Sequence, residues 1–309
     1  MATADVGLPA RPWHLGADLG EIWSYPFMVN AFLAGTAVAV LAGAIGWFMV
    51  LRRQSFAGHT LALVGFPGAA GATLLGIGAV FGYFAFCVAA AFVIAAIPRT
   101  GRGGSGQESA LIGTVQAFLL SCGFLFIALY EGFLGGVNAL LFGSFLGITT
   151  AQVWTLVAVT AGTLAVLVVI GRPLLFSSTD PDVAAGRGVP TRALSTVFLV
   201  LLGVAAAGTS QITGVLLVFA LLVMPAATAQ TLTARPALGM ALSVLIGVLV
   251  TWFALIVAYH STYPIGFFVT TFAFGTYVLA RLGVLARWGL RDAVSRSSAV
   301  RAAAAGDLP

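Results

Sequence analysis

Very few side chains in this sequence could bind a metal ion or catalyse a reaction. His59 stands alone in a stretch of small and apolar residues, and Glu131 and His260 lie far from it along the chain. Zinc normally takes three or four ligands, so a single imidazole makes a weak metal site. His59 is therefore interpreted either as a hydrogen-bonded structural residue or as a weak metal ligand, and Glu131 and His260 as solvated loop residues.

The residues needed for one common type of ATP hydrolysis are missing. All 14 basic residues are arginines, and a chain without lysine cannot contain the GxxxxGK loop that cradles phosphates. We therefore do not expect this chain to be an enzyme. If ATP drives it, another subunit must bind the nucleotide.

The composition places the chain in a membrane. Hydrophobic residues make up 60% of it and charged residues only 7%, with a mean hydropathy of +1.08, whereas soluble domains carry about 25% charged residues. Apolar segments near the ~20 residues that cross a bilayer recur along the sequence. They predict an all-α transmembrane bundle of eight or nine spans, surrounded by lipid. The predicted spans are 28–50, 61–78, 80–97, 110–130, 152–171, 194–208, 213–231, 238–259 and 265–283.

The arginines predict the orientation of this bundle. Cytoplasmic loops of membrane proteins are enriched in Lys and Arg close to the helix ends. Only Arg11 falls on the other side; the remaining arginines lie in alternate loops or in the tail, which predicts an outside N-terminus and an inside C-terminus. The net charge of +5 therefore reflects topology rather than nucleic-acid binding. The arginines on the predicted inner side are Arg52, Arg53, Arg99, Arg102, Arg172, Arg187, Arg192, Arg235, Arg281, Arg287, Arg291, Arg296 and Arg301.

Three regions follow from this topology. Residues 1–27 are an extracellular segment with a short interfacial helix, residues 28–283 are the transmembrane domain, and residues 284–309 are a cytoplasmic tail that we expect to be disordered after Arg287. Residues 131–147 could form either a re-entrant hairpin or a surface helix. All nine carboxylates map to loops, tails or helix ends, which disfavours a proton-coupled carrier, since such carriers usually need an ionisable residue at membrane depth.

Two prolines inside predicted spans mark candidate positions for a translocation path. A proline removes a helix hydrogen bond, and the freed carbonyl is tolerated in a membrane where protein or a water-filled cavity satisfies it. We expect broken helices at both positions, with simple kinked packing as the alternative. The residues concerned are Pro67 and Gly68 in the first segment and Met224, Pro225, Ala226, Ala227 and Thr228 in the second.

A polar stretch between the predicted spans 152–171 and 194–208 predicts a short helix on the inner face. Thr179 or Asp180 can cap its start, Pro181 suits its first turn, and Gly188 suits its end. Such a helix offers a docking element for a cytoplasmic partner.

Five segments in order resemble the permease subunits of zinc and manganese ABC importers. The most specific is 214–229, which reads GVLLVFALLVMPAATA. The others are 50–58 (VLRRQSFAG), 66–68 (FPG), 141–147 (LFGSFLG) and 180–190 (DPDVAAGRGVP). The resemblance covers the chain from about residue 26 to residue 282.

This resemblance implies a homodimer around a central path, fed by an extracellular metal-binding protein and driven by two cytoplasmic ATP-binding subunits. It also implies that the polar stretch is the coupling helix that meets the ATPase. The residues assigned to coupling on this ground are Asp180, Pro181, Asp182, Ala185, Gly188, Val189 and Pro190.

One departure from the family pattern concerns the metal. Family members generally carry a histidine four residues after the first ligand, which places both on one helix face. Here the first position is His59, the second is Leu63, and Ala62 replaces the usual serine. His59 could form half of a site that the second copy completes, or touch the ion only briefly.

The sequence therefore predicts a multi-pass permease of the bacterial plasma membrane that imports zinc or manganese and binds no cofactor of its own. Arrival of the metal as a chelate, such as a siderophore complex, would explain Leu63, because a chelate needs no bare ligands in the pore. A channel or carrier without an ATPase, and a scaffold that transports nothing, are the competing classes.

Overall fold

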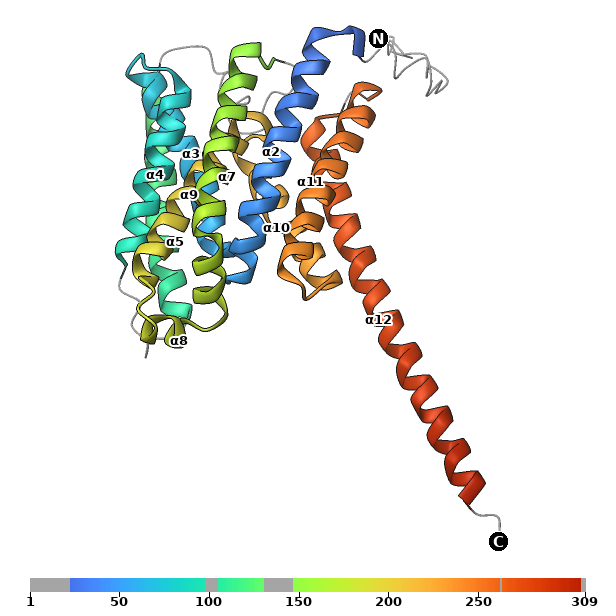
Figure 1. Cartoon of the computed structure of the whole chain (residues 1–309). Coiled ribbons are helices and arrows are strands. Elements are labelled where there is room, and N and C mark those ends of the chain that lie inside the picture. The colour runs from blue at the N-terminus through green and yellow to red at the C-terminus, as the bar shows by residue number, and fades with distance from the viewer. Residues whose placement is uncertain (1–22, 98–104, 131–146, 262, 307–309) are drawn as a thin grey trace.

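The computed structural model describes residues 23–97, 105–130, 147–261 and 263–306, all within a helical architecture (Figure 1). The predicted extracellular segment 1–27 and the segment 131–147 therefore fall almost wholly outside the described residues. The helices are α2 (Pro26–Leu51), α3 (Ser55–Leu74), α4 (Ala79–Ala96), α5 (Ser105–Leu129), α7 (Thr150–Thr179), α8 (Pro181–Gly186), α9 (Thr191–Thr213), α10 (Val215–Leu232), α11 (Pro236–Tyr259) and α12 (Ile265–Gly306).

A helix overlaps most of each of the nine predicted spans, so the all-α prediction is confirmed for the described residues. Within the described residues, seven helices are long and apolar enough to cross a membrane, namely α2, α4, α5, α7, α9, α11 and α12. The described apolar part of α10, Val218–Leu232, is shorter than these. The number of crossings and the side of each terminus therefore stay predictions.

Several helix boundaries differ from the predicted ones. α3 begins at Ser55, six residues before the predicted span, and α7 continues to Thr179. The prediction of a disordered tail is wrong, because α12 continues to Gly306. Alanine and arginine, which are frequent after residue 285, have high helix propensities, and these sustain a helix where hydropathy gives no signal.

Helix α2 is the centre of the bundle. It is apolar around its whole circumference and buried along most of its length, as expected of a helix surrounded by others. Gly43 and Gly46 let its neighbours approach closely: a Cβ added at Gly43 would lie 2.7 Å from the Cα of Val244 on α11, and one at Gly46 would overlap the Leu222 carbonyl oxygen on α10. Small residues of this kind allow close helix packing in lipid.

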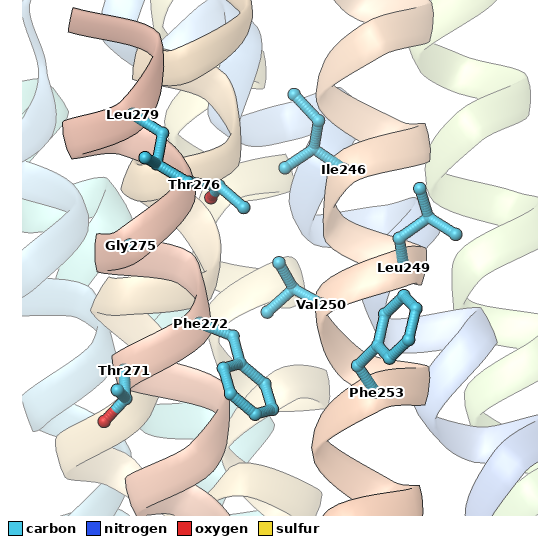
Figure 2. Close-up of a pocket in the computed structure, with 9 residues that line it drawn as sticks. All are labelled: Ile246, Leu249, Val250, Phe253, Thr271, Phe272, Gly275, Thr276 and Leu279. Carbon is cyan, nitrogen blue, oxygen red and sulfur yellow. The ribbon is translucent and has the colours of Figure 1, made fainter. Parts of the chain in front are cut away.

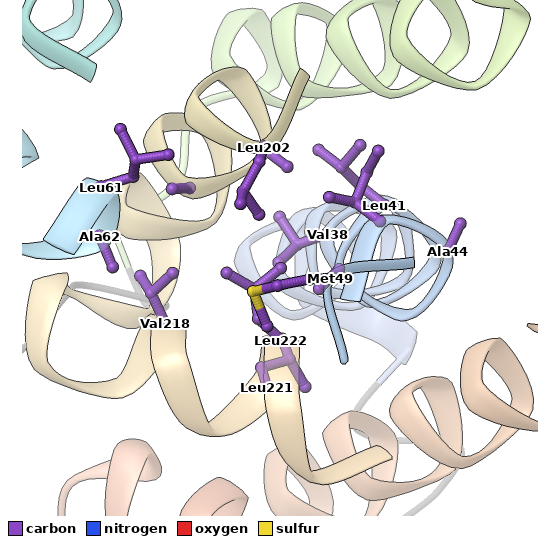
Figure 3. Close-up of a cluster of buried hydrophobic side chains, with 14 of the residues drawn as sticks. Val38, Leu41, Ala44, Met49, Leu61, Ala62, Leu202, Val218, Leu221 and Leu222 are labelled. Atoms are coloured by element: carbon purple, nitrogen blue, oxygen red, sulfur yellow. The ribbon is translucent and has the colours of Figure 1, made fainter. Parts of the chain in front are cut away.

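The main cluster of buried side chains extends over most of the bundle and includes residues of α2, α3, α9 and α10. Val38, Leu41 and Met49 of α2 meet Leu61 of α3, Leu202 of α9 and Leu222 of α10 in one cluster (Figure 3). These six side chains come from segments up to 184 positions apart in the sequence, that is, 222 − 38. The cluster holds α3, α9 and α10 around α2.

Hydrogen bonds along α2 connect it to α7, α10 and α11. Asn30 donates to the Ile148 carbonyl at 3.2 Å, just before α7, while Ser243 of α11 donates to the Gly43 carbonyl at 2.8 Å. Gln230 of α10 donates to the Trp47 carbonyl at 2.9 Å. Interhelical bonds of this kind contribute on average about 0.6 kcal/mol each in a membrane. Together they tie α7, α10 and α11 to α2.

Candidate functional site

The short helix α8 forms as the sequence predicts. The Asp180 carboxylate accepts a hydrogen bond from the Val183 backbone N–H at 3.0 Å, and Pro181 occupies the first turn. Gly188 has a φ of 79°, a left-handed conformation that glycine adopts readily and that ends the helix. Local capping chemistry therefore sets both ends of α8.

Helix α8 presents most of its side chains outwards. Asp182, Val183 and Ala185 are exposed, whereas Ala184 is fully buried and anchors the helix. Val183 keeps 46% of its surface accessible. The helix lies at one end of the bundle, beside the ends of α7 and α9 and at the end where α12 leaves the bundle (Figure 1). This small surface is accessible to a partner protein.

The remaining predicted coupling residues lie at the junction between α8 and α9. Val189 is half-buried and packs against the main core, and Pro190 is the N-cap residue of α9. The Val189 backbone N–H donates to the Ala184 carbonyl at 3.0 Å. Displacement of α8 would therefore act directly on the start of α9.

The expected helix break at Pro225 is wrong. α10 is continuous from Val215 to Leu232 and contains this proline. The chain breaks instead at Gly214, between α9 and α10, where φ is 74°. Pro225 and Ala226 are buried, Met224 and Ala227 are half-buried, and the buried Thr228 hydroxyl donates to the Met224 carbonyl at 2.7 Å.

The expected break at Pro67 is also wrong, because α3 continues through it to Leu74. Gly68 lies against Gly82 and Phe86 of α4, and a Cβ added at Gly123 of α5 would lie 3.0 Å from the Pro67 Cα. Neighbouring helices hold the chain helical on both sides of each proline. The Pro67 segment packs on α4 and α5. The Pro225 segment follows Leu222, which packs on α2. These contacts therefore do not bring the two predicted path segments together.

The His59 side chain of α3 reaches α10. Its ring lies 4.8 Å from the Phe219 ring, edge to face, and its Nδ1 is buried without a hydrogen bond to any described residue. Ala62 and Val218 lie at the same contact between α3 and α10 (Figure 3). The sequence did not predict a role for Phe219. This residue lies in the segment 214–229 that resembles the family, but nothing in that segment indicates that it contacts His59.

Other metal-binding side chains do not join His59. Within the described parts of the chain, no three His, Cys, Asp or Glu residues come close enough to hold an ion together. His260 Nδ1 lies 3.0 Å from the Ile256 carbonyl oxygen, and Glu131 is outside the described residues. His59 and His260 are the predicted ligands that the structure describes, and among the described residues neither belongs to a group of three side chains that could hold an ion.

A pocket of about 590 Å³ between α11 and α12 has a different chemistry (Figure 2). Its lining is aliphatic and aromatic except for two threonines, and the Thr276 hydroxyl already donates to the Ala273 carbonyl at 2.8 Å. None of the predicted site residues lines it. The pocket suits hydrocarbon rather than a metal ion. Its lining residues are Ile246, Leu249, Val250, Phe253, Thr271, Phe272, Gly275, Thr276 and Leu279.

Restoring the second imidazole tests whether His59 can bind a metal. Leu63 is half-buried one helical turn after His59, so Leu63→His places two ligands on one face. We expect the purified protein to retain metal about tenfold more tightly, equivalent to 1.4 kcal/mol. Mass spectrometry of the bound metal measures this, with Leu63→Gln as a polar control. Equal metal content in both variants would remove His59 from the candidates.

Comparison with known proteins places most of the helical region in one family. The model of the ABC 3 transport family matches residues 24–283. The manganese transport system membrane protein MntC of Halalkalibacterium halodurans is 26% identical over 273 residues, covering 87% of this chain and 92% of that protein. The manganese import system permease protein ScaB of Streptococcus parasanguinis is 28% identical over 242 residues, covering 78% of this chain and 85% of that protein.

Two solved structures share the fold. PsaBC from Streptococcus pneumoniae, in complex with a Fab, gives a TM-score of 0.76 at 23% identity and covers 86% of this chain and 94% of that one. An inward-facing putative metal-chelate type ABC transporter gives 0.62 at 18% identity, with 92% and 93% covered. Since the family model spans nearly all of the helical region, from just before α2 well into α12, the chain belongs to the ABC 3 transport family.

Proposed function

We propose that this chain is the membrane permease of a bacterial ABC importer that brings a divalent transition metal into the cell, with manganese as the first candidate. The observation that carries the proposal is the match to manganese transport proteins over most of both chains. Zinc stays the second candidate, because nothing about His59 or its surroundings selects between the two ions.

ATP hydrolysis belongs to a separate subunit in this proposal. The chain has no lysine for a phosphate-binding loop, and α8 supplies an exposed, capped element for docking. Binding of ATP by that partner would shift the permease between outward-open and inward-open arrangements, which requires a differential binding energy of a few kcal/mol. The coupling residues are those of α8 and its junction with α9.

The proposed topology has nine crossings, an extracellular N-terminus and a cytoplasmic C-terminus. Support comes from helix ends: α2 ends, α11 begins and α12 leaves the bundle at the end that carries α8 (Figure 1). Arg52, Arg187 and Arg235 lie at these helix ends, as the positive-inside rule requires of a cytoplasmic face.

The proposed assembly is a homodimer with ATP-binding subunits inside and a metal-binding protein outside. The path would run beside the contact of His59 with Phe219, since His59 has an unbonded ring nitrogen there. A second copy could then supply the missing ligands. Pro67, Gly68 and residues 224–228 remain the proposed path-forming segments on α3 and α10.

Import of a metal chelate is the second candidate function. Leu63 stands where a second imidazole would make an ion site, and it packs against the buried cluster that contains Phe66 and Tyr83 rather than opening a polar cavity. A chelate brings its own ligands and needs only contacts with its outer surface. Uptake of the complex, but not of the free ion, would favour this alternative.

Elemental analysis of cells tests the proposal directly. Cells with and without this chain are grown at limiting manganese, zinc and iron, and the metal content of each is measured. We expect selective loss of one metal, with manganese the first candidate, when the chain is absent. Unchanged content of all three metals would contradict import of a free ion, and repeating the experiment with chelated metal would then test the second candidate.

A further inference from the structure

Arg52 joins three helices at the α8 end of the bundle. It is the C-cap residue of α2, and its guanidinium donates from Nη1 to Ser178 Oγ at 2.9 Å and from Nη2 to Ser195 Oγ at 3.1 Å. The same group lies 5.5 Å from the centre of the Phe198 ring. The planar fork of arginine suits such a double contact, and a lysine ammonium could not reproduce it.

The two serines flank the docking helix. Ser178 lies in the last turn of α7, two residues before the Asp180 cap of α8, and Ser195 lies near the start of α9. The Ser178 hydroxyl also donates to the Leu174 carbonyl at 2.5 Å, which fixes its acceptor lone pairs toward the arginine. One guanidinium therefore spans both stems of the α7–α8–α9 hairpin.

The last two turns of α2 continue this connection to α10. Gly46 lies against Leu222, and the Trp47 carbonyl accepts the Gln230 side-chain amide at 2.9 Å. Leu222 is one helical turn from Phe219, the residue that faces His59. A continuous chain of contacts thus runs from α8 through Arg52 and α2 to the contact between α3 and α10.

We propose that Arg52 is a positioning residue that makes the α7–α8–α9 hairpin and α2 move as one body, so that displacement of α8 reaches α10. The inference rests on the proposed function, in which movement is transmitted from the docking helix α8 to the translocation path. The two hydrogen bonds of Arg52 to Ser178 and Ser195, called the clamp below, lie within the permease. Their role can therefore be tested without cargo or ATP.

The first test measures rigidity. Spin labels at Arg192→Cys on α9 and Leu232→Cys on α10, both exposed positions, report the distance between the hairpin and α10 in purified permease. Cys122→Ala removes the half-buried cysteine, which could otherwise be labelled. Mixing with excess unlabelled chain ensures that the measured distance lies within one copy. We expect Arg52→Lys to broaden or shift the distance distribution. An unchanged distribution would overturn the clamp.

Arg53→Lys is the matched control. Arg53 is exposed and lies in the turn after α2 with a φ of 56°. Its replacement by lysine keeps the positive charge, as Arg52→Lys does. It should leave the distance distribution as it is in the unsubstituted chain. Ser178→Ala and Ser195→Ala each remove one arm of the clamp, and we expect each to produce part of the Arg52→Lys effect.

The second test measures coupling in the complete complex in lipid vesicles. We expect Arg52→Lys to keep ATPase activity within about twofold while metal uptake per ATP falls about tenfold, since one hydrogen bond to a charged group is lost or weakened. An equal fall in ATPase activity, uptake and complex yield would show a folding role and overturn the proposal. An unsubstituted complex that hydrolyses ATP without moving metal would instead contradict the proposed cargo, and the distance measurement would still decide the clamp.

Discussion

Replacing Gly46 with alanine is expected to separate α10 from α2 and destabilise the whole bundle. The added methyl group would overlap the Leu222 backbone carbonyl, and a backbone atom cannot move aside as a side chain can. Overpacking usually costs 1–3 kcal/mol, and a clash with backbone at the central helix should cost about 3 kcal/mol or more. Thermal unfolding of the detergent-purified protein, followed by tryptophan fluorescence, measures the loss.

Gly162→Ala on α7 provides the control for this experiment. A Cβ at Gly162 meets no atom within 4 Å, and alanine is favoured over glycine in a helix by roughly 1 kcal/mol. We expect this variant to be as stable as the original protein or slightly more so. Equal stability of Gly46→Ala and Gly162→Ala would show that α2 and α10 are not in direct backbone contact. The core of Figure 3 would then need a different arrangement.

Reversing the charge of Asp182 is expected to abolish binding of the ATPase subunit. Asp182 is exposed in the first turn of α8 and makes no contact in the core. Asp182→Arg therefore changes the docking surface, while the loss of a favourable helix-dipole interaction costs the fold only about 0.3–1 kcal/mol. Co-purification of the ATPase subunit with the permease from solubilised membranes should fall about tenfold or more, the equivalent of 1.4 kcal/mol per tenfold.

Two further variants separate charge from position. Asp182→Asn removes the charge and keeps the shape of the side chain, so partial binding would show that the carboxylate itself is recognised. Arg235→Glu reverses a charge at the start of α11, at the same end of the bundle but outside α8. Normal ATPase binding by Asp182→Arg, with the permease still dimeric in the membrane, would contradict the assignment of α8 as the coupling helix.

Local chemistry determined much of this protein. The length and spacing of apolar segments placed a helix over each of nine predicted ranges, because a segment that must satisfy its backbone within lipid has few alternatives to a helix. Asp180, Pro181 and Gly188 located α8 in advance, since caps and left-handed turns depend on the residues at the turn itself. The family resemblance, carried by short ordered segments, likewise needed no knowledge of packing.

Local chemistry gave wrong answers where neighbouring helices decide the outcome. A proline removes one hydrogen bond, which suggested breaks at Pro67 and Pro225, but α3 and α10 are buried among other helices that hold them helical. The break at Gly214 lies close to the boundary between the predicted spans 194–208 and 213–231, and glycine there adopts a positive φ readily.

Tertiary structure alone decided which distant residues meet. Arg52 reaches Ser178 and Ser195 across 126 and 143 positions, and His59 faces Phe219 across 160, that is, 219 − 59. Hydropathy and capping describe one segment at a time, whereas these contacts depend on how whole helices pack around α2. The sequence by itself determined the helical membrane class of the protein and the position of α8. The packing of glycine-lined helices determined how closely α2 approaches α10 and α11, because close contact between backbones depends on both partners at once.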